Sequence, residues 1–406
     1  MDIVVDKACG LDVHKKTVVA CIMGSGIKKE TRTYRTFTRE LEELKAWLKE
    51  NGITHVAMES TGVYWKPVFN LLEDSFEIML VNARHIKNVP GRKTDVQDSE
   101  WLCKLLRSGL VRGSFIPPKD IRELRDLTRY RRKLVQTKTA EKNRMQKVLE
   151  TANIKLSSVV SNSFGVSGSE IIEELLRGEL SVDEMAKLAR GRLKKKEDEL
   201  KEALYGNLDE HHRFMLKASQ EHIKHIEKQI KELDERISKR MKKYREEYEL
   251  LQTIPGIKEH GASSIIAEIG VDMDRFPTED HLSSWAGMSP GNNESAGKKK
   301  AQRTTHGDKN LKAVLTEGAW AAARTKNTYL RAKYYSLVGR RGKKKALVAV
   351  GHKILVACYY ILRHKVCYDE LGFDYLNKRK SNRIAHNYVK KLKELGYEVN
   401  IAPQAA

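Results

Sequence analysis

Two aspartates three positions apart, Asp95 and Asp98, lie in the segment KTDVQDSE, where a helix is expected to begin. Asp98 is four residues and Asp95 seven residues before Leu102, so both acids extend the helix's apolar stripe. That stripe consists of Trp101, Leu102, Leu105 and Leu106, before Gly109 ends the helix. Helix capping is the alternative role, because carboxylates in a first turn gain about 0.3 to 1 kcal/mol from the helix dipole.

Two further acids, Asp12 and Glu59, stand at the ends of predicted apolar strands, where a charge is disfavoured unless it is matched. If all four carboxylates meet, like charges about 4 Å apart repel by roughly 4 kcal/mol at an effective dielectric constant of 20. This repulsion exceeds the dipole's contribution, so such a cluster requires divalent cations, and hard oxygen ligands select Mg²⁺ or Mn²⁺. The alternative for Asp12 and Glu59 is that each is a solvated acid near a turn.

The elements that must position these acids form an α/β domain over residues 1–118. Three apolar or alternating segments, 3–13, 17–23 and 28–37, predict strands joined by tight turns. A helix follows over 41–48, and strands over 54–60 and 76–81 are separated by a helix around 63–74. This order predicts a hairpin meander extended by parallel strands in a mixed sheet.

Long helices are predicted for residues 119–250. The first, over 119–150, is strongly basic, and Arg129, Arg131, Arg132 and Lys133 lie beside its apolar stripe. A second helix has an apolar repeat of mostly three and four residues, which favours an intramolecular or intermolecular coiled coil over a long helix that packs on its own domain. Its members are Ile223, Ile226, Ile230, Leu233, Ile237, Met241, Tyr244 and Tyr248. Between the helices, residues 157–208 are expected to hold two short helical stretches in a solvated insertion without chemistry.

The C-terminal domain, expected over 251–376, is mostly helical and carries most of the excess positive charge. Residues 286–345 contain 15 lysines and arginines against 3 acids, a net of +12 out of the chain's +22. Such a block favours a phosphate-facing surface. The segment 253–270 predicts a turn and a helix, either half of a helix-hairpin-helix element that holds a DNA phosphate or a plain packing turn. Candidate contacts here are Lys298, Lys299, Lys300, Arg303, Arg340 and Arg341.

The composition sets the class of partner and the compartment. A chain of 406 residues with 40% hydrophobic content buries a real core, and its net charge of +22 favours nucleic acid as the partner. His352 and Lys353 interrupt the longest apolar segment, so no membrane span is expected. Acids near the N-terminus argue against a signal peptide, which predicts a cytoplasmic, nucleoid-associated protein. The five scattered cysteines predict reduced core residues, and the basic tail 377–406 has no assigned task.

Three motifs, GLDVHKK, VAMESTGVYW and KTDVQD, resemble in order and spacing the DEDD transposases, recombinases of bacterial insertion sequences. The resemblance implies a RuvC-like RNase H fold with Asp12, Glu59, Asp95 and Asp98 as metal ligands. It also implies a catalytic serine, which the segment from Pro290 to Lys298 assigns to Ser295, with Ser289 as the lesser candidate. Glu294 and Ala296 depart from the family's small polar residues or glycine. The family further implies a homo-oligomer, a dimer or tetramer, and a noncoding guide RNA that pairs with donor and target DNA.

Three hypotheses follow for the whole chain. The first is an RNA-guided DNA recombinase that uses both the acids and Ser295. The second is a RuvC-like nuclease or junction resolvase, in which the acids hydrolyse DNA and the serine is incidental. The third is a nonenzymatic nucleic-acid scaffold, in which the acids are helix caps. From the residues alone, a serine in a basic loop lacks a visible activating base and is most often a plain loop residue.

Overall fold

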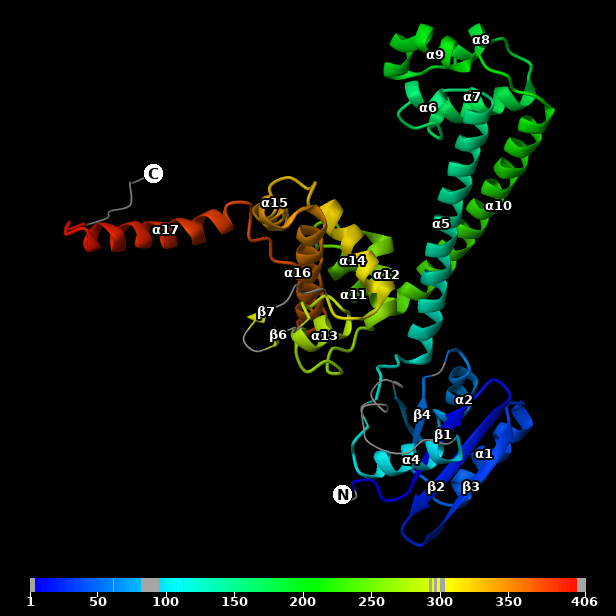
Figure 1. Cartoon of the computed structure of the whole chain (residues 1–406), viewed down its shortest axis with the longest axis vertical. Helices are drawn as coiled ribbons and strands as arrows, with labels where there is room; N and C mark the ends of the chain where they lie inside the picture. Colours follow the sequence, from blue (N-terminus) through cyan, green and yellow to red (C-terminus); the bar gives the residue numbers. More distant parts are fainter. Residues whose placement is uncertain are drawn as a thin grey trace. The chain divides into compact units, whose positions relative to one another are not determined.

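The computed structural model describes residues 4–60, 62–81, 95–111, 113–291, 294–295, 298–299 and 304–399. The chain separates into two compact units, Met1–Pro117 and Pro118–Ala406. The first unit is mixed α/β and the second is mostly helical, as Figure 1 shows.

A five-stranded sheet with the order β3-β2-β1-β4-β5 forms the centre of the first unit. Strands β1 (Ala8–Val13), β2 (Thr17–Gly24) and β3 (Ile27–Arg35) form an antiparallel meander. Strands β4 (His55–Glu59) and β5 (Glu77–Val81) continue the sheet in parallel with β1. The predicted mixed sheet, with a meander first and parallel strands after it, is confirmed.

The alternation of side chains gives this sheet two covered faces. Cys9, Leu11 and Val13 of β1 share a core cluster with buried residues of α1 (Thr38–Glu50) and α2 (Trp65–Leu72). Ala8 of β1 instead belongs to the cluster of α4 (Asp95–Arg107) on the opposite face. Even-numbered positions of β1 therefore face α4, because successive strand residues point to opposite sides.

Gly10 lies where the backbone of α4 comes very close to β1. A Cβ atom added at Gly10 would lie 2.1 Å from the Ser99 carbonyl oxygen and 2.6 Å from the Cys103 backbone nitrogen. Only a residue without a side chain leaves room for the helix backbone at this distance. Gly10 lies two residues before Asp12 on the same face of β1. This contact therefore fixes the distance between α4 and the strand next to Asp12.

Two long helices, α5 (Lys119–Thr151) and α10 (Glu210–Met241), pack side by side in the second unit. Figure 1 shows them running together over most of their length. Leu134 of α5 and the apolar stripe of α10, from Ile226 to Leu233, share a buried cluster. The predicted stripe continues to Tyr248, but α10 ends at Met241, and Tyr244 and Tyr248 lie in η2 (Lys242–Tyr244) and α11 (Arg245–Leu251).

The segment between these two helices has a core of its own, which the sequence did not reveal. It forms α6 (Leu156–Val159), α7 (Val166–Arg177), α8 (Val182–Ala186), η1 (Gly191–Lys196) and α9 (Glu197–Leu204). Buried residues from these helices join residues of α5 and α10, among them Leu149 and Leu216, in one cluster. The expectation of a merely solvated insertion is therefore wrong: the segment is a folded cap on the helix pair.

The remaining helices enclose the C-terminal core. They are α12 (Glu259–Ile269), α13 (Glu279–Trp285), α14 (Lys309–Ala322), α15 (Tyr329–Arg341), α16 (Lys343–His364) and α17 (Tyr375–Glu394). Helix α16 is long and apolar enough to cross a membrane, with a mean hydropathy of 1.5 over its most apolar window. Its contacts with α11, α13, α14 and α15 account for that apolarity, because Val350, Ile354 and Leu355 are buried there.

All five cysteines are free. Cys9, Cys21, Cys103 and Cys358 are buried, as expected for core residues, and burial raises the pKa of the Cys103 and Cys358 thiols to about 12. Cys367 is exposed, so its prediction as a core residue is wrong.

Candidate active site

Asp12 and Glu59 lie next to each other at the carboxyl ends of two neighbouring strands. The parallel register pairs Leu11 of β1 with Met58 of β4, so the next residue on each strand is the acid. Asp12 follows Gly10 by two positions and Glu59 follows Ala57 by two, and Gly10 and Ala57 both face α4. The alternation therefore directs both carboxylates to the α4 side of the sheet.

Helix α4 brings Asp98 to the same side. It begins at Asp95, and its buried residues Leu102, Cys103 and Leu106 pack on the sheet. Asp98 is half-buried, one residue before the fully buried Ser99, whose carbonyl lies over Gly10. The side chain of Asp95 lies outside the described residues, so its predicted place in the site stays a prediction.

The electrostatics of Asp12 show that Asp98 and Glu59 lie near enough to act on its carboxyl. Burial raises the pKa of the Asp12 carboxyl, and the nearby charges of Asp98 and Glu59 raise it further. His14 acts in the opposite direction, since its Nε2 lies 3.0 Å from Asp12 Oδ2. His14 was not among the predicted site residues, although its position two residues after Asp12, at the turn, is a signal for it.

Divalent cations fit the chemistry of these side chains. Carboxylate oxygens are the hard ligands that Mg²⁺ and Mn²⁺ prefer, and a cation would offset the repulsion that raises the pKa of Asp12. Among the described residues, no group of three His, Cys, Asp or Glu side chains is arranged to hold a metal ion. Only three of the four predicted ligands have described side chains, because that of Asp95 is not among them.

Ser295 lies on a short hairpin of the second unit. Strand β6 (Glu294–Ser295) pairs antiparallel with β7 (Lys298–Lys299), and the register places Ser295 opposite Lys298. The side chains of these four residues, together with Lys300 and Arg303, lie outside the described residues. Ser289 is half-buried at the base of the same hairpin, where its carbonyl accepts a hydrogen bond from the Thr305 backbone N–H at 3.2 Å.

Three of the arginines predicted to contact nucleic acid are held in ion pairs within the second unit. Arg129 binds Glu268 and Asp308, with nitrogen–oxygen distances of 2.7 to 2.8 Å. Arg131 pairs with Asp234 of α10. Arg132 pairs with Glu317 of α14. These contacts give each arginine an intramolecular role, and its role toward nucleic acid stays a prediction.

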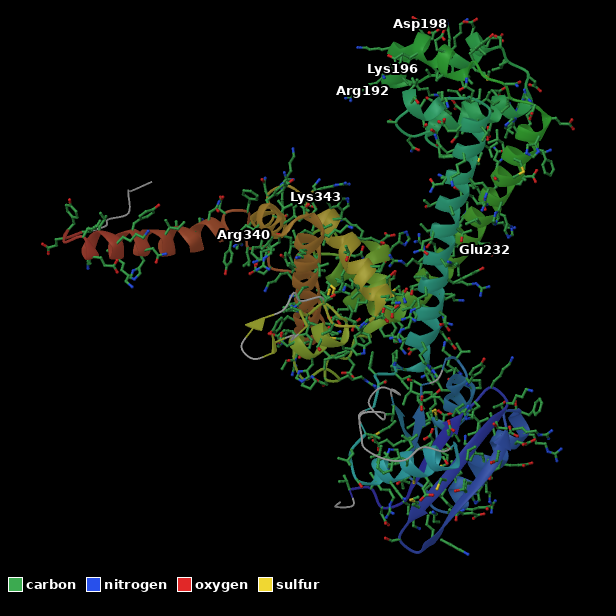
Figure 2. The ribbon with its side chains drawn as sticks, in the orientation of Figure 1. Arg192, Lys196, Asp198, Glu232, Arg340 and Lys343 are labelled. Carbon is green, nitrogen blue, oxygen red and sulfur yellow. The ribbon has the colours of Figure 1, made fainter. Side chains whose placement is uncertain are left out.

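Other predicted basic contacts are exposed. Lys133 of α5 is exposed, and Arg340 and Arg341 end α15 with their side chains open to solvent. Figure 2 labels Arg340 and Lys343, which lie on either side of Gly342 at the turn between α15 and α16. Lys343, Lys344 and Lys345 are also exposed, so this turn presents five cations to solvent within six residues.

The predicted turn before α12 packs firmly against α14. Gly256 has a φ of +89°, and a Cβ atom there would lie 2.3 Å from the Gly318 carbonyl oxygen. A cavity of about 680 Å³ lies beside this turn, lined by α5, α12 and α14. Its cations, Arg129, Arg131, Arg132 and Lys258, share the lining with the acids Glu259, Glu268 and Glu317. The mixed charges do not single out an anion as its ligand.

Two family models match this chain. The first, described as a DEDD transposase, matches residues 9–154. The second, described as the transposase IS116/IS110/IS902 family, matches residues 248–336. No curated protein matches the chain.

The fold, the converging acids and these matches define the chain as a DNA transposase, an enzyme that cuts and joins DNA. More particularly, it belongs to the IS110 family of DEDD transposases. The resemblance found from the three motifs is confirmed, and the hypothesis of a nonenzymatic scaffold is wrong because the family is enzymatic. The cap of the helix pair and the helix α17 lie outside both matched regions.

Proposed function

We propose that this transposase cuts and rejoins DNA through Ser295, assisted by divalent cations held by Asp12, Glu59, Asp95 and Asp98. The observation that carries the proposal is the convergence of Asp12, Glu59 and Asp98 on the α4 side of the sheet, where the charges of Glu59 and Asp98 act on Asp12. A RuvC-like RNase H fold is part of the same proposal. It is supported by a meander of three antiparallel strands followed by two parallel ones.

The proposed serine step is a transesterification. The Ser295 hydroxyl oxygen attacks a DNA phosphorus atom, the new oxygen–phosphorus bond forms, and the bond to one bridging oxygen breaks. The serine proton passes to solvent and the departing oxygen takes a proton from solvent, so the phosphodiester is exchanged and not hydrolysed. A free hydroxyl of another strand then attacks the same phosphorus and releases the serine, which rejoins DNA without an external energy source.

In this proposal the second unit supplies the serine nucleophile, and the first unit supplies the acids that hold the metal ions. A serine hydroxyl is a weak nucleophile without a base or a metal ion, and the motif around Ser295 contains no Ser-His-Asp arrangement. Bound Mg²⁺ or Mn²⁺ supplies charge stabilisation for the attacking and leaving oxygens. The four acids hold that charge in place, and Lys298, opposite Ser295 in the hairpin, is the proposed partner for the phosphate.

The proposed partners are donor and target DNA and a noncoding guide RNA encoded by the element. The basic surface of Lys133, Lys298, Lys299, Lys300, Arg303, Arg340 and Arg341, together with Arg129, Arg131 and Arg132, is proposed for nucleic-acid contacts. The protein is proposed to act as a dimer or tetramer on the nucleoid in the cytoplasm, with α5 and α10 packed as a coiled coil. Purification without nuclease, followed by sequencing of copurified RNA, tests the guide: one enriched RNA supports it, and random fragments contradict it.

Substitution of the serine separates the recombinase from a simple nuclease. Ser295→Ala is expected to abolish both strand cleavage and the covalent protein–DNA species, because no nucleophile remains, while Ser289→Ala retains both. Denaturing gels of reactions on end-labelled DNA measure the two products together. Cleavage that persists in Ser295→Ala without a covalent species would support the second hypothesis, a metal-dependent nuclease, and contradict the proposal.

A further inference from the structure

The hairpin that carries Ser295 is closed at its base by backbone contacts. Pro290 and Thr304 form an antiparallel bridge, and the Thr305 N–H donates to the Ser289 carbonyl at 3.2 Å. Gly287 and Gly307 lie in direct contact, since a Cβ atom on Gly307 would be 2.1 Å from the Gly287 nitrogen. The segments that precede and follow the hairpin, 287–290 and 304–307, are therefore held together at its base.

This base is fastened to the first turn of α14. The Oδ1 atom of Asp308 caps the helix by accepting hydrogen bonds from the Asn310 and Leu311 backbone N–H groups at 2.8 and 2.9 Å. Lys312 donates from Nζ to the Gly287 carbonyl at 3.2 Å and to the Thr304 hydroxyl. The segments before and after the hairpin, at Gly287 and Thr304, both bind to Lys312 of α14. The orientation of the first turn of α14 therefore sets the orientation of the hairpin base.

Arg129 connects that first turn to α5 and α12. The second carboxylate oxygen of Asp308, Oδ2, accepts from Arg129 at 2.8 Å. Arg129 also binds both oxygens of Glu268, a side chain that is only 2% exposed. Burial raises the pKa of Glu268 against the pull of Arg129 and Arg125, which shows how deeply this network is desolvated. Arg125 further donates to the Ala267 carbonyl at 3.0 Å, fixing the end of α12.

Packing already holds α14 in the core without this network. Leu311, Leu315, Ala319 and Ala322 of α14 are fully buried. Buried ion pairs contribute little net stability compared with apolar packing, but their directional bonds fix geometry. The two oxygens of Asp308 have different partners: Oδ1 caps α14, and Oδ2 binds Arg129 and so aligns the start of α14 with α5.

We propose that Arg129 and Asp308 are positioning residues for Ser295, acting through the base of its hairpin. This inference rests on the proposed role of Ser295 as the nucleophile. This role does not depend on the nucleic-acid contact proposed for Arg129; the two residues act through the base and hold the hairpin where the serine attacks. Misplacing a reacting group by about 1 Å costs on the order of 100-fold in rate.

The variant Asp308→Asn separates the hydrogen bond to Arg129 from the capping of α14. Its amide oxygen still caps α14, because asparagine is as good a cap as aspartate, but its NH₂ group cannot accept from Arg129. We expect the single-turnover rate of covalent protein–DNA formation at saturating DNA to fall about 10- to 100-fold. DNA affinity and the melting temperature should stay near wild type. Hydrogen exchange at the Thr305 amide should accelerate while that of Leu315 does not.

Matched variants complete the test. Arg240→Gln removes an arginine–carboxylate pair with Glu123 that joins α10 to α5, and it should leave the rate unchanged. Arg129→Lys should recover part of the rate lost in Arg129→Gln, because lysine keeps one charged hydrogen bond, and this pair decides the matter if Asp308→Asn does not fold. Rate, affinity and melting temperature falling together, or a wild-type rate in Asp308→Asn, overturns the positioning role. A covalent species that persists in Ser295→Ala instead overturns the proposed nucleophile itself.

Discussion

At the scale of single residues, the first unit brings together acids that are far apart in the chain. Asp12 and Glu59 end adjacent parallel strands, and Asp98 projects from the helix that covers the same face. Burial raises the pKa of Asp12 first, and the charges of Asp98 and Glu59 raise it further. A role for Asp98 as a metal ligand, beyond helix capping, is part of the proposal.

Asp98→Asn tests this assignment while preserving size. We expect Mg²⁺-dependent strand cleavage to fall by more than about 100-fold, because even outer partners of metal ligands cost 10- to 100-fold when changed. Isothermal titration with Mg²⁺ and a cleavage assay measure the affinity and the rate. The exposed acid Glu43 of α1 provides the control, since Glu43→Gln keeps the fold and should leave both quantities unaltered. Normal cleavage by Asp98→Asn would show that this acid is a cap and not a ligand.

At the scale of elements, the contact of α4 with β1 decides whether the acids meet. The backbone of α4 at Ser99 and Cys103 occupies the space that a side chain at residue 10 would need. Any larger residue must push the helix away from the strand or tilt it. The acid on the helix then moves relative to the acid on the strand, although the core cluster itself can remain.

Gly10→Ala should therefore weaken Mg²⁺ binding more than it lowers stability. We expect at least about a tenfold loss in affinity, in the range found when the surroundings of metal ligands are disturbed. Gly113→Ala is the matched control in the same unit, because its added Cβ would meet only ordinary contacts at 3.8 Å or more. Thermal unfolding and Mg²⁺ titration of both variants give the comparison, and equal affinities would contradict a positioning role for Gly10.

The pair of α5 and α10 is held by apolar side chains, which gives a second prediction at this scale. Ile226 is 1% exposed between the helices. Ile226→Ala should lower the free energy of unfolding by about 2 to 5 kcal/mol, through lost burial and the cavity that remains. Lys228→Ala, on the exposed side of α10, should change it by less than about 0.5 kcal/mol. Chemical denaturation measures both, and similar values would show that the stripe does not pack as described.

The sequence predicted the elements whose patterns are local. The apolar segment of β2 and the periodic stripe of α10 follow from neighbouring residues, so their positions were close to those observed, whereas β1 begins at Ala8, five residues later than predicted. The ion-pair partners of Arg129 could not be predicted from neighbouring residues, because Glu268 is 139 residues and Asp308 is 179 residues away in the sequence. The cap was also missed, since its core is assembled from several short helices, none of which has a long apolar stripe.

At the scale of the whole molecule, the net charge of +22 is unevenly distributed, and the exposed turn between α15 and α16 concentrates part of it. Binding to a nucleic acid releases counterions for each phosphate that is neutralised, so the affinity falls steeply with salt. Arg340 and Arg341 are exposed there, while Arg192 and Lys195 carry the same charge on η1 of the cap. Figure 2 labels Arg192 in the cap and Arg340 near α15.

The double variant Arg340→Ala/Arg341→Ala should reduce the slope of log affinity against log salt by about 2, roughly one unit for each lost phosphate contact. Arg192→Ala/Lys195→Ala removes the same charge from the cap and should leave the slope near wild type. Fluorescence anisotropy with labelled duplex DNA over a range of salt concentrations measures both slopes. Equal slopes in the two double variants would mean that binding follows net charge and not this surface.

The central claim is that Ser295 becomes joined to DNA in a reaction that depends on the four acids. Trapping the reaction, digesting the protein and the DNA, and sequencing the modified peptide by mass spectrometry tests it most directly. The predicted result is a nucleotide phosphate on Ser295 in the wild type and none in the Asp98→Asn variant. A nucleotide on Ser289 or another residue, or cleaved DNA with no modified peptide, would contradict the account.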